Sequence, residues 1–204
     1  MFRKILIALV VLIVIAIAVA FSLFYYRTHR YDKLIAEISP KYQLEPELVK
    51  AVIYEESFFD AEARSSQNAI GLMQVTSIAV QEWIDSTHSR NLSDALSNIT
   101  DQYKNQRDPQ LEKALINPQI NMHIGCWYLQ NLLNRYRNKS ATLAVALAAY
   151  NAGPSNVDRW ANDAELTKLS QTDFIERIEF PVTRNYVKKI IERYSNYKQA
   201  KAFK

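Results

Sequence analysis

Two adjacent glutamates, Glu55 and Glu56, end the apolar stretch "AVIYEESFFD" and are followed at once by a serine. If this stretch is a helix, Glu56 shares a face with Val49, Val52 and Ile53. A carboxyl on an apolar face has a raised pKa, because desolvation disfavours its charged form, and a neutral glutamate can protonate a leaving oxygen. Helical phase therefore favours Glu56 over Glu55 as a general acid. The alternative is that both are the solvated end of a helix.

Cysteine and histidine suggest no further chemistry. The single cysteine, Cys126, excludes an internal disulfide and a lipidated cysteine after the N-terminal apolar stretch. The histidines His29, His88 and His123 are scattered and show no metal-ligand spacing with Cys126. His123 and Cys126 are expected to pack or to lie at the surface rather than to form a thiol nucleophile. The sequence thus implies no metal and no organic cofactor.

The N-terminal segment is apolar enough to cross a membrane. Residues 5–24 are interrupted only by Ser22, and twenty helical residues span the roughly 30 Å of a bilayer core. Tyr25 and Tyr26 fall where an interfacial aromatic belt lies. We expect residues 1–4 to be cytoplasmic, residues 5–26 to be a single-pass anchor, and the rest of the chain to be extracytoplasmic.

A cleaved secretory signal is the main alternative to the anchor. Ala18-Val19-Ala20 has the small-residue pattern of a cleavage site. The apolar run continues past that site through Phe24, however, and is longer than the apolar core of most signals. A buried helix of a soluble domain is the third alternative. Both leading interpretations export residues 31–204.

Charge argues against a nucleic-acid partner. The formal net charge of +4 comes entirely from Arg3, Lys4, Arg27 and Arg30, and residues 31–204 hold 21 basic and 21 acidic side chains. A neutral domain lacks the basic face that nucleic-acid binding requires. Without a disulfide, its stability must come from an ordinary hydrophobic core.

Beyond residue 30 the pattern predicts an all-α domain. Periodic apolar residues predict helices in four stretches, which are "PELVKAVIYEES", "AIGLMQVTSIAVQEWI", "NPQINMHIGCWYLQNLLNRYR" and "TLAVALAAY", and in a final helix that carries Tyr186 and Ile190. The polar stretch Ser86–Asp108 is predicted to be a loop-rich insertion or lid. With only three glycines in the chain, each is expected where a close backbone approach or a positive φ requires it.

Four sequence blocks together resemble the soluble-type lytic murein transglycosylases, whose domain is lysozyme-like. The blocks are "AVIYEESFFDAEARSSQNAIGLMQ", "NPQINMHIGCWYL", "ALAAYNAGPSNVDRW" and "TRNYVKKI". They follow the family's order and spacing over residues 40–195. The resemblance implies a lysozyme-like, all-α transglycosylase domain at 40–195, preceded by a juxtamembrane segment at 27–39 and followed by a basic tail at 196–204.

The resemblance also implies roles for individual residues. The catalytic glutamate of the family stands directly before a serine, which here makes Glu56 catalytic. The residues that match sugar-binding positions are Ser65, Met73, Gln74, Tyr150, Asn151 and Tyr186. Each has a structural alternative, as a helix-end hydrogen-bonding group, a core aromatic or, for Asn151, part of a helix C-terminal cap.

The reaction that the resemblance implies needs one carboxyl group, whereas ordinary glycosidases use two. The glutamate protonates the glycosidic oxygen and then assists the 6-hydroxyl of the same N-acetylmuramic acid in attacking its own anomeric carbon, which gives a 1,6-anhydro product. An intramolecular nucleophile has a high effective concentration. The implied partners are peptidoglycan glycan strands, the membrane, and proteins of the cell envelope.

Two positions depart from the family pattern. Asn68 stands where many members have a glycine, and Val182 stands where many members have a glutamate before Thr-Arg. Asparagine enters the left-handed region more easily than most residues. Glu179 is a candidate to replace part of the missing carboxylate. Two alternatives remain, a hydrolase in which Glu55 or Asp60 guides a water, and a catalytically weak glycan-binding module of an envelope machine.

Overall fold

The computed structural model describes residues 2–87 and 109–202, so nearly all of the predicted insertion at Ser86–Asp108 lies outside the described residues. The described residues form helices and two isolated bridges, Arg64 with Ile70 and Ile70 with Val75, and no strand. The predicted all-α class is thereby confirmed.

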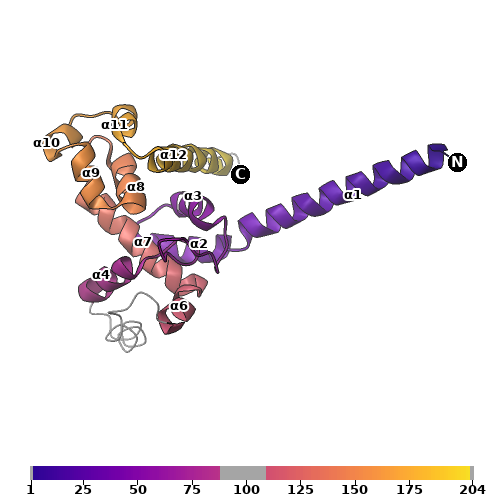
Figure 1. The fold of residues 1–204 in the computed structure, drawn as a ribbon, viewed down its shortest axis with the longest axis horizontal. Helices are drawn as coiled ribbons and strands as arrows, with labels where there is room; N and C mark the ends of the chain where they lie inside the picture. The colour runs from indigo at the N-terminus through magenta and orange to yellow at the C-terminus, as the bar shows by residue number, and fades with distance from the viewer. Residues whose placement is uncertain (1, 88–108, 203–204) are drawn as a thin grey trace.

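The first helix, α1 (Phe2–His29), projects away from the other helices (Figure 1). The helical segment Phe2–Tyr42 contains an 18-residue window of mean hydropathy 3.3, none of it buried, which suffices by length and composition to cross a membrane. Only at Arg27 and Thr28 does α1 begin to lose its exposure. The predicted anchor is therefore an apolar helix that meets the domain near its C-terminal end, where the Phe24 ring contacts Phe58 and Thr28 is buried.

Two short helices continue directly from α1 into the domain. They are α2 (Asp32–Ile38) and the 3₁₀ helix η1 (Ser39–Tyr42). Ile35 and Ile38 are buried in the core, and Ser39 is also buried. Most of the segment predicted to be juxtamembrane thus packs as part of the domain.

The helix that carries the two glutamates is α3 (Pro46–Ser57). Pro46 stands at its start, where a missing N–H costs no hydrogen bond. Val49, Val52 and Ile53 are fully buried, as their spacing predicts. The helix ends because Phe58 adopts a left-handed conformation with φ 50°, and its N–H bonds to the carbonyl of Tyr54.

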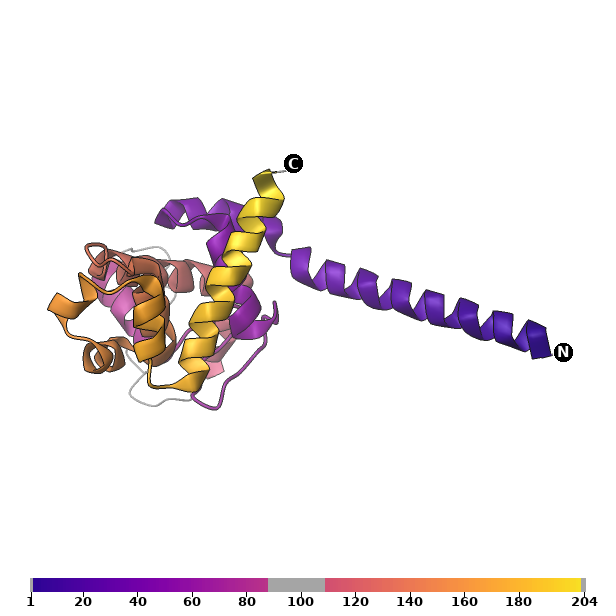
Figure 2. The ribbon, with the colours of Figure 1, turned by 90° about the horizontal axis from the view of Figure 1, so that it is seen from above.

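The remaining helices include a buried apolar one on which several of the others pack. In chain order they are α4 (Ser77–Thr87), α6 (Pro109–Leu115), α7 (Pro118–Arg135), α8 (Thr142–Ala152), α9 (Pro154–Trp160), α10 (Asp163–Leu166), α11 (Gln171–Arg177) and α12 (Pro181–Ala202). The predicted core helix is α8, whose residues 144–149 are all buried. It packs against α7, α9 and α12, and α12 also packs along α3. Figure 2 shows α12 on the side of the domain from which α1 departs.

The segment before α4 differs from the sequence expectation. The apolar pattern of Met73, Ile78 and Trp83 predicts a helix after a break at Gly71, yet the helix begins only at Ser77. Gly71 with φ 80° and Gln74 with φ 48° are both left-handed, so residues 70–75 form a tight turn closed by two hydrogen bonds between Ile70 and Val75. Periodicity predicted a helix here because the buried side chains of a compact turn can imitate a helical stripe.

Candidate active site

Glu56 is the penultimate residue of α3, and its half-buried side chain meets Tyr186 where α3 packs along α12. Burial raises the pKa of its carboxyl to about 7, an effect that the nearby charge of Glu55 reinforces. The hydroxyl of Tyr186 on α12 donates to Glu56 Oε1 at 2.5 Å and partly offsets the rise, because it stabilises the carboxylate. A substantial part of Glu56 is therefore protonated at neutral pH.

Glu55 faces a different environment, although it is the next residue. Its side chain is only 11% exposed, and Oε1 accepts two hydrogen bonds from Arg193, from Nε at 3.1 Å and from Nη2 at 2.7 Å. The same guanidinium stacks on the Tyr54 ring, 3.3 Å from its centroid. Lys189 lies 3.9 Å from the other oxygen. Glu55 is thus held in an ion pair and is not a solvated helix end.

Two tyrosines predicted to bind sugar come together beside Glu56. Tyr186 is buried, and burial followed by the charge of Glu56 raises its pKa well above the usual range. Burial and the same charge raise the pKa of Tyr150, on α8. Both phenols therefore stay neutral and can donate hydrogen bonds. Tyr150 donates to the carbonyl oxygen of Met73 at 2.8 Å, which ties α8 to the turn before α4.

Met73 contributes to this site through its backbone in the observed conformation. Its side chain is fully buried and packs where α7 has Gly125. A Cβ at Gly125 would lie 2.7 Å from both Cβ and Sδ of Met73, so the glycine permits the close approach. The sugar-binding role assigned to Met73 stays a prediction, and its side chain is in the core.

Ser65 and Gln74 organise the loop that follows α3. Ser65 Oγ accepts hydrogen bonds from the backbone N–H groups of Gln67 and Ala69. Gln74 Nε2 donates to the carbonyl oxygens of Ala63 and Gly71, at 3.2 and 3.0 Å. These contacts match the structural alternative for both residues, and their sugar-binding roles stay predictions.

The loop is also tied to α3 and adopts the backbone that the sequence anticipated. Ser57 Oγ donates to the carbonyl oxygen of Leu72 at 2.9 Å, directly beside Glu56. Asn68 has φ 60°, so it occupies the left-handed conformation that glycine would supply. The loop thereby keeps its shape without that glycine.

Asn121 is a residue whose importance the sequence did not reveal. It is fully buried on α7, and its Oδ1 accepts from the N–H of Met73 at 2.8 Å. Its Nδ2 donates to the carbonyl oxygens of Ile70 and Leu115, at 2.8 and 2.9 Å. A Cβ at Gly71 would lie 2.3 Å from the same Nδ2. A polar residue inside an apolar helical stripe was the available signal, but the partners come from distant segments.

A hydrogen bond between side chains joins the start of α12 to the end of α8. Thr183 is buried and donates from Oγ1 to Asn151 Oδ1 at 2.7 Å. Val182 is 77% exposed, and the carboxylate of Glu179 lies 3.6 Å from the Arg159 guanidinium. Asn151 is exposed, and the sugar-binding role assigned to it stays a prediction.

Within residues 2–87 and 109–202, no group of three histidine, cysteine, aspartate or glutamate side chains could hold a metal ion. Cys126 is fully buried, and burial raises its pKa far above that of a reactive thiol. His123 hydrogen-bonds through Nδ1 with the Tyr42 hydroxyl at 2.9 Å.

The family model and the curated relatives that match this chain are all named as transglycosylases. The model of the family described as "Transglycosylase SLT domain" matches residues 33–171. The soluble lytic murein transglycosylase of Salmonella typhimurium is 27% identical over 168 residues, which cover 82% of this chain and 23% of that protein. Membrane-bound lytic murein transglycosylase C of Actinobacillus pleuropneumoniae is 28% identical over 187 residues, which cover 84% of this chain and 46% of the relative.

Solved structures have the same fold. An inactive mutant of lytic transglycosylase Slt from Pseudomonas aeruginosa superposes with a TM-score of 0.61 at 25% identity, over 81% of this chain and 23% of that protein. The complex of the 70-kDa soluble lytic transglycosylase with bulgecin A gives 0.63 at 23% identity, over 84% of this chain and 24% of that one. The chain spans less than half the length of these curated relatives and solved structures. Because the family model covers more than half of its residues, the chain belongs to the Transglycosylase SLT domain family.

Proposed function

We propose that this chain is a peptidoglycan lytic transglycosylase that cleaves the β-1,4 bond between N-acetylmuramic acid and N-acetylglucosamine without water and leaves 1,6-anhydro ends. The observation that carries the proposal is the Glu56 carboxyl, whose pKa is raised to about 7 and whose Oε1 accepts a hydrogen bond from Tyr186. The names of the relatives support the substrate class.

In the first step Glu56 acts as a general acid. Because Tyr186 donates to Oε1, the acidic proton belongs on Oε2, from which it passes to the glycosidic oxygen as the bond to the anomeric carbon breaks. Negative charge then develops on Glu56, and the hydrogen bond from Tyr186 strengthens as it does so. Tyr186 therefore stabilises the product of the proton transfer more than its starting state.

In the second step Glu56 acts as a base. The carboxylate accepts the proton of the 6-hydroxyl of the same muramic acid as that oxygen bonds to the anomeric carbon. The carboxyl group returns to its starting form, so acid and base roles alternate on one residue. General acid–base help of this kind contributes about 10²- to 10⁴-fold in rate.

The neighbouring carboxylates are poorly placed to activate water for a hydrolase. Glu55 is bound by Arg193, and Asp60 Oδ1 accepts from the backbone N–H of Glu62 at 3.0 Å. Each carboxylate is thus already engaged in a structural contact. This favours the intramolecular 6-hydroxyl over water as the nucleophile.

We also propose that α1 anchors the enzyme in a membrane, with the domain on the extracytoplasmic side. The apolar, unburied α1 and the membrane-bound name of the Actinobacillus relative support this placement. Binding to other proteins of the cell envelope stays a prediction from the sequence.

Substitution of the two glutamates tests the catalytic assignment. Glu56→Gln is expected to abolish the release of muropeptides from purified murein sacculi, whereas Glu55→Gln retains a measurable rate. Equal residual activity in the two variants would refute the role of Glu56. The Pseudomonas inactive mutant carries a glutamate-to-glutamine exchange, which supports this choice of substitution.

Mass spectrometry of the wild-type digest tests the product. Anhydro-muropeptides are lighter than their hydrolysed counterparts by one water. A digest that contains only water-added products would establish a hydrolase. If the protein binds murein but releases no product, it is a binding module.

A further inference from the structure

The turn that follows the catalytic helix has an unusual backbone. Phe58 has φ 50° and Phe59 has φ 61°, so two consecutive residues with side chains occupy the left-handed region. This region is disfavoured for residues with a Cβ, and it persists only where the surrounding structure holds it. Phe58 stands two residues after Glu56, so whatever holds this turn also fixes where α3 ends.

Packing holds the two rings. Phe59 is fully buried, and Tyr54 contacts both phenyl rings edge-on, with centroids 5.0 Å from Phe58 and 6.1 Å from Phe59. Tyr54 is itself covered by the Arg193 guanidinium of α12. The side chains of the turn are thus tied to the same helix that supplies Tyr186.

Two arginines, Arg27 in the last turn of α1 and Arg30 directly after that helix, bond the backbone carbonyls of the turn. Arg27 Nε donates to the Phe58 carbonyl oxygen at 2.7 Å, and Arg30 Nη2 donates to the Phe59 carbonyl oxygen. Arg30 follows the last residue of α1, and its backbone N–H still bonds to the carbonyl oxygen of Tyr26 in that helix. The Arg27 guanidinium also lies 4.4 Å from the centroid of the Phe58 ring. Each carbonyl of the left-handed pair therefore has a charged donor, one from the last turn of α1 and one from the residue after it.

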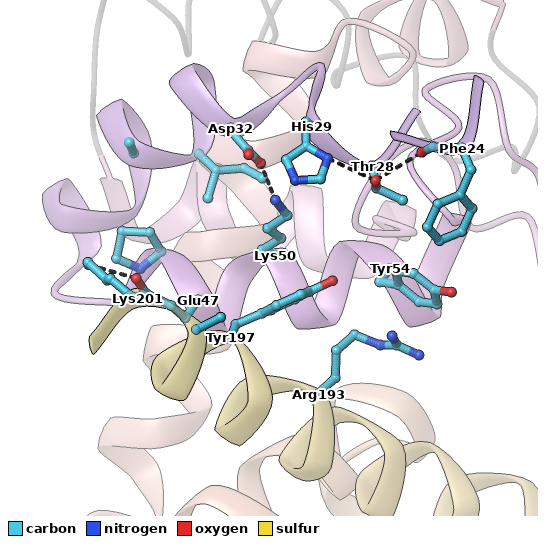
Figure 3. Close-up of a pocket in the computed structure, with 14 residues that line it drawn as sticks. Phe24, Thr28, His29, Asp32, Glu47, Lys50, Tyr54, Arg193, Tyr197 and Lys201 are labelled. Carbon is cyan, nitrogen blue, oxygen red and sulfur yellow. Dashed lines mark hydrogen bonds and ion pairs between the residues drawn. The ribbon is translucent and has the colours of Figure 1, made fainter. Parts of the chain in front are cut away.

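Beside these contacts, a cavity lies between the end of α1 and the domain. This cavity of about 640 Å³ separates the end of α1 from α12, with Phe24, Thr28 and His29 on one side and Arg193 and Tyr197 on another (Figure 3). The contacts that join this end of α1 to the Phe58–Phe59 turn are those of Arg27 and Arg30 and of the Phe24 ring, whose centroid lies 6.0 Å from that of Phe58.

From this geometry we infer that Arg27 and Arg30 are positioning residues for Glu56. By bonding the two carbonyls they hold the left-handed turn, and the turn holds the last residues of α3 against α12, where Tyr186 meets Glu56. The end of the membrane helix is then part of the scaffold of the active site, and attachment and catalysis are mechanically connected. Both arginines lie after Ala18-Val19-Ala20, so the inference holds whether or not the N-terminal segment is cleaved there.

This inference rests on the proposed role of Glu56 as the acid. If the turn loosens, water reaches the Glu56 carboxyl and its pKa falls, because desolvation is what raises it. A general acid must be protonated, so the descending limb of the rate–pH profile moves to lower pH. Sugar binding by residues away from the turn is unaffected, so kcat falls and KM stays nearly constant.

The test compares Arg27→Ala, Arg30→Ala and Arg27→Lys in the full-length protein in detergent micelles, acting on purified murein sacculi. Lys33→Ala is the matched control, because it removes one exposed positive charge on the adjacent helix α2. We expect both alanine variants to lose roughly 10- to 100-fold in kcat, with KM within about twofold of wild type. Arg27→Lys, which keeps a charged donor, is expected to recover part of the rate and of the pH profile.

Three results would overturn the inference. They are a wild-type kcat and pH profile in both alanine variants, an equal loss in Lys33→Ala, or a rate loss with no movement of the descending limb. Glu56→Gln is assayed in parallel. If Glu56→Gln is active, the proposed function fails; if it is inactive while both arginine variants behave as wild type, only the positioning role fails. Arg27→Lys serves as the milder variant where an alanine variant does not melt cooperatively.

Discussion

The hydroxyl of Tyr186 lies 2.5 Å from Oε1 of Glu56, although the two residues are 130 positions apart in the chain. This one contact joins the end of α3 to the first half of α12. It gives the carboxyl a donor that stabilises its charged form, in surroundings that otherwise favour the neutral form. The balance of the two effects keeps the Glu56 pKa near 7, which suits a group that must both donate and accept a proton.

Replacing Tyr186 with phenylalanine removes the donor and little else. The pKa of Glu56 should rise, so the descending limb of the rate–pH profile moves to higher pH. The rate should fall about 10- to 100-fold, because a hydrogen bond to a charged group contributes about 1.5–3 kcal/mol and each 1.36 kcal/mol is tenfold. Measured kcat across pH checks both effects. Tyr42→Phe is the control, since it deletes a phenol that bonds His123 instead.

Glu55→Gln should move the descending limb of the rate–pH profile to lower pH, opposite to the effect of Tyr186→Phe. The charge of Glu55 raises the pKa of Glu56, so its removal lowers that pKa and brings the descending limb to lower pH. The variant also loses the ion pair with Arg193, and we expect unfolding to become easier by about 1–3 kcal/mol. Rate profiles and thermal melts separate the two effects. A limb that moves to higher pH would contradict the electrostatic assignment.

Glu56 should make the folded domain less stable at alkaline pH. Its folded-state pKa of about 7 exceeds its usual value of 4.5, so between these values the folded protein binds more protons than the unfolded chain. Stability therefore falls as pH rises through this range, by up to about 3 kcal/mol. Glu56→Gln removes this titration, so it should raise the melting temperature at pH 8 more than at pH 5. An equal gain at both pH values would argue against the raised pKa.

Gly125→Ala tests the close contact between α7 and Met73. Alanine is the better helix former by about 1 kcal/mol, but its Cβ would lie 2.7 Å from Met73 atoms in the fully packed core. We expect a net destabilisation of about 1–3 kcal/mol. A lower rate should accompany it, because the Met73 carbonyl accepts the Tyr150 hydroxyl.

Gly153→Ala provides the comparison for that variant. Gly153 has φ 87° and nothing within 4 Å of an added Cβ, so this change strains only the backbone. Chemical denaturation of both variants distinguishes steric from dihedral effects. A Gly125→Ala protein more stable than wild type would show that Met73 repacks freely.

The sequence by itself determined the helical class and the N-terminal apolar helix, and it carries the prediction that Glu56 is the acid. These features depend on local information. The spacing of Val49, Val52 and Ile53 orients α3, and the residue after Glu56 matches a family motif. Asn68 was likewise expected to be tolerated in place of glycine, and it lies in the left-handed region. Periodicity failed at residues 70–75, because a turn whose side chains are buried by distant helices can carry the pattern of a helix.

Tertiary structure alone decided how these residues work together. Asn121 satisfies the turn at Gly71 from another helix, Arg193 removes Glu55 from solvent, and Tyr186 reaches Glu56 from the last helix. Arg27 bonds the turn after α3 from the last turn of α1. Such partners are far apart in the chain, so no local spacing encodes them. The pKa of Glu56 is set by the burial and the contacts that appear only when these helices pack.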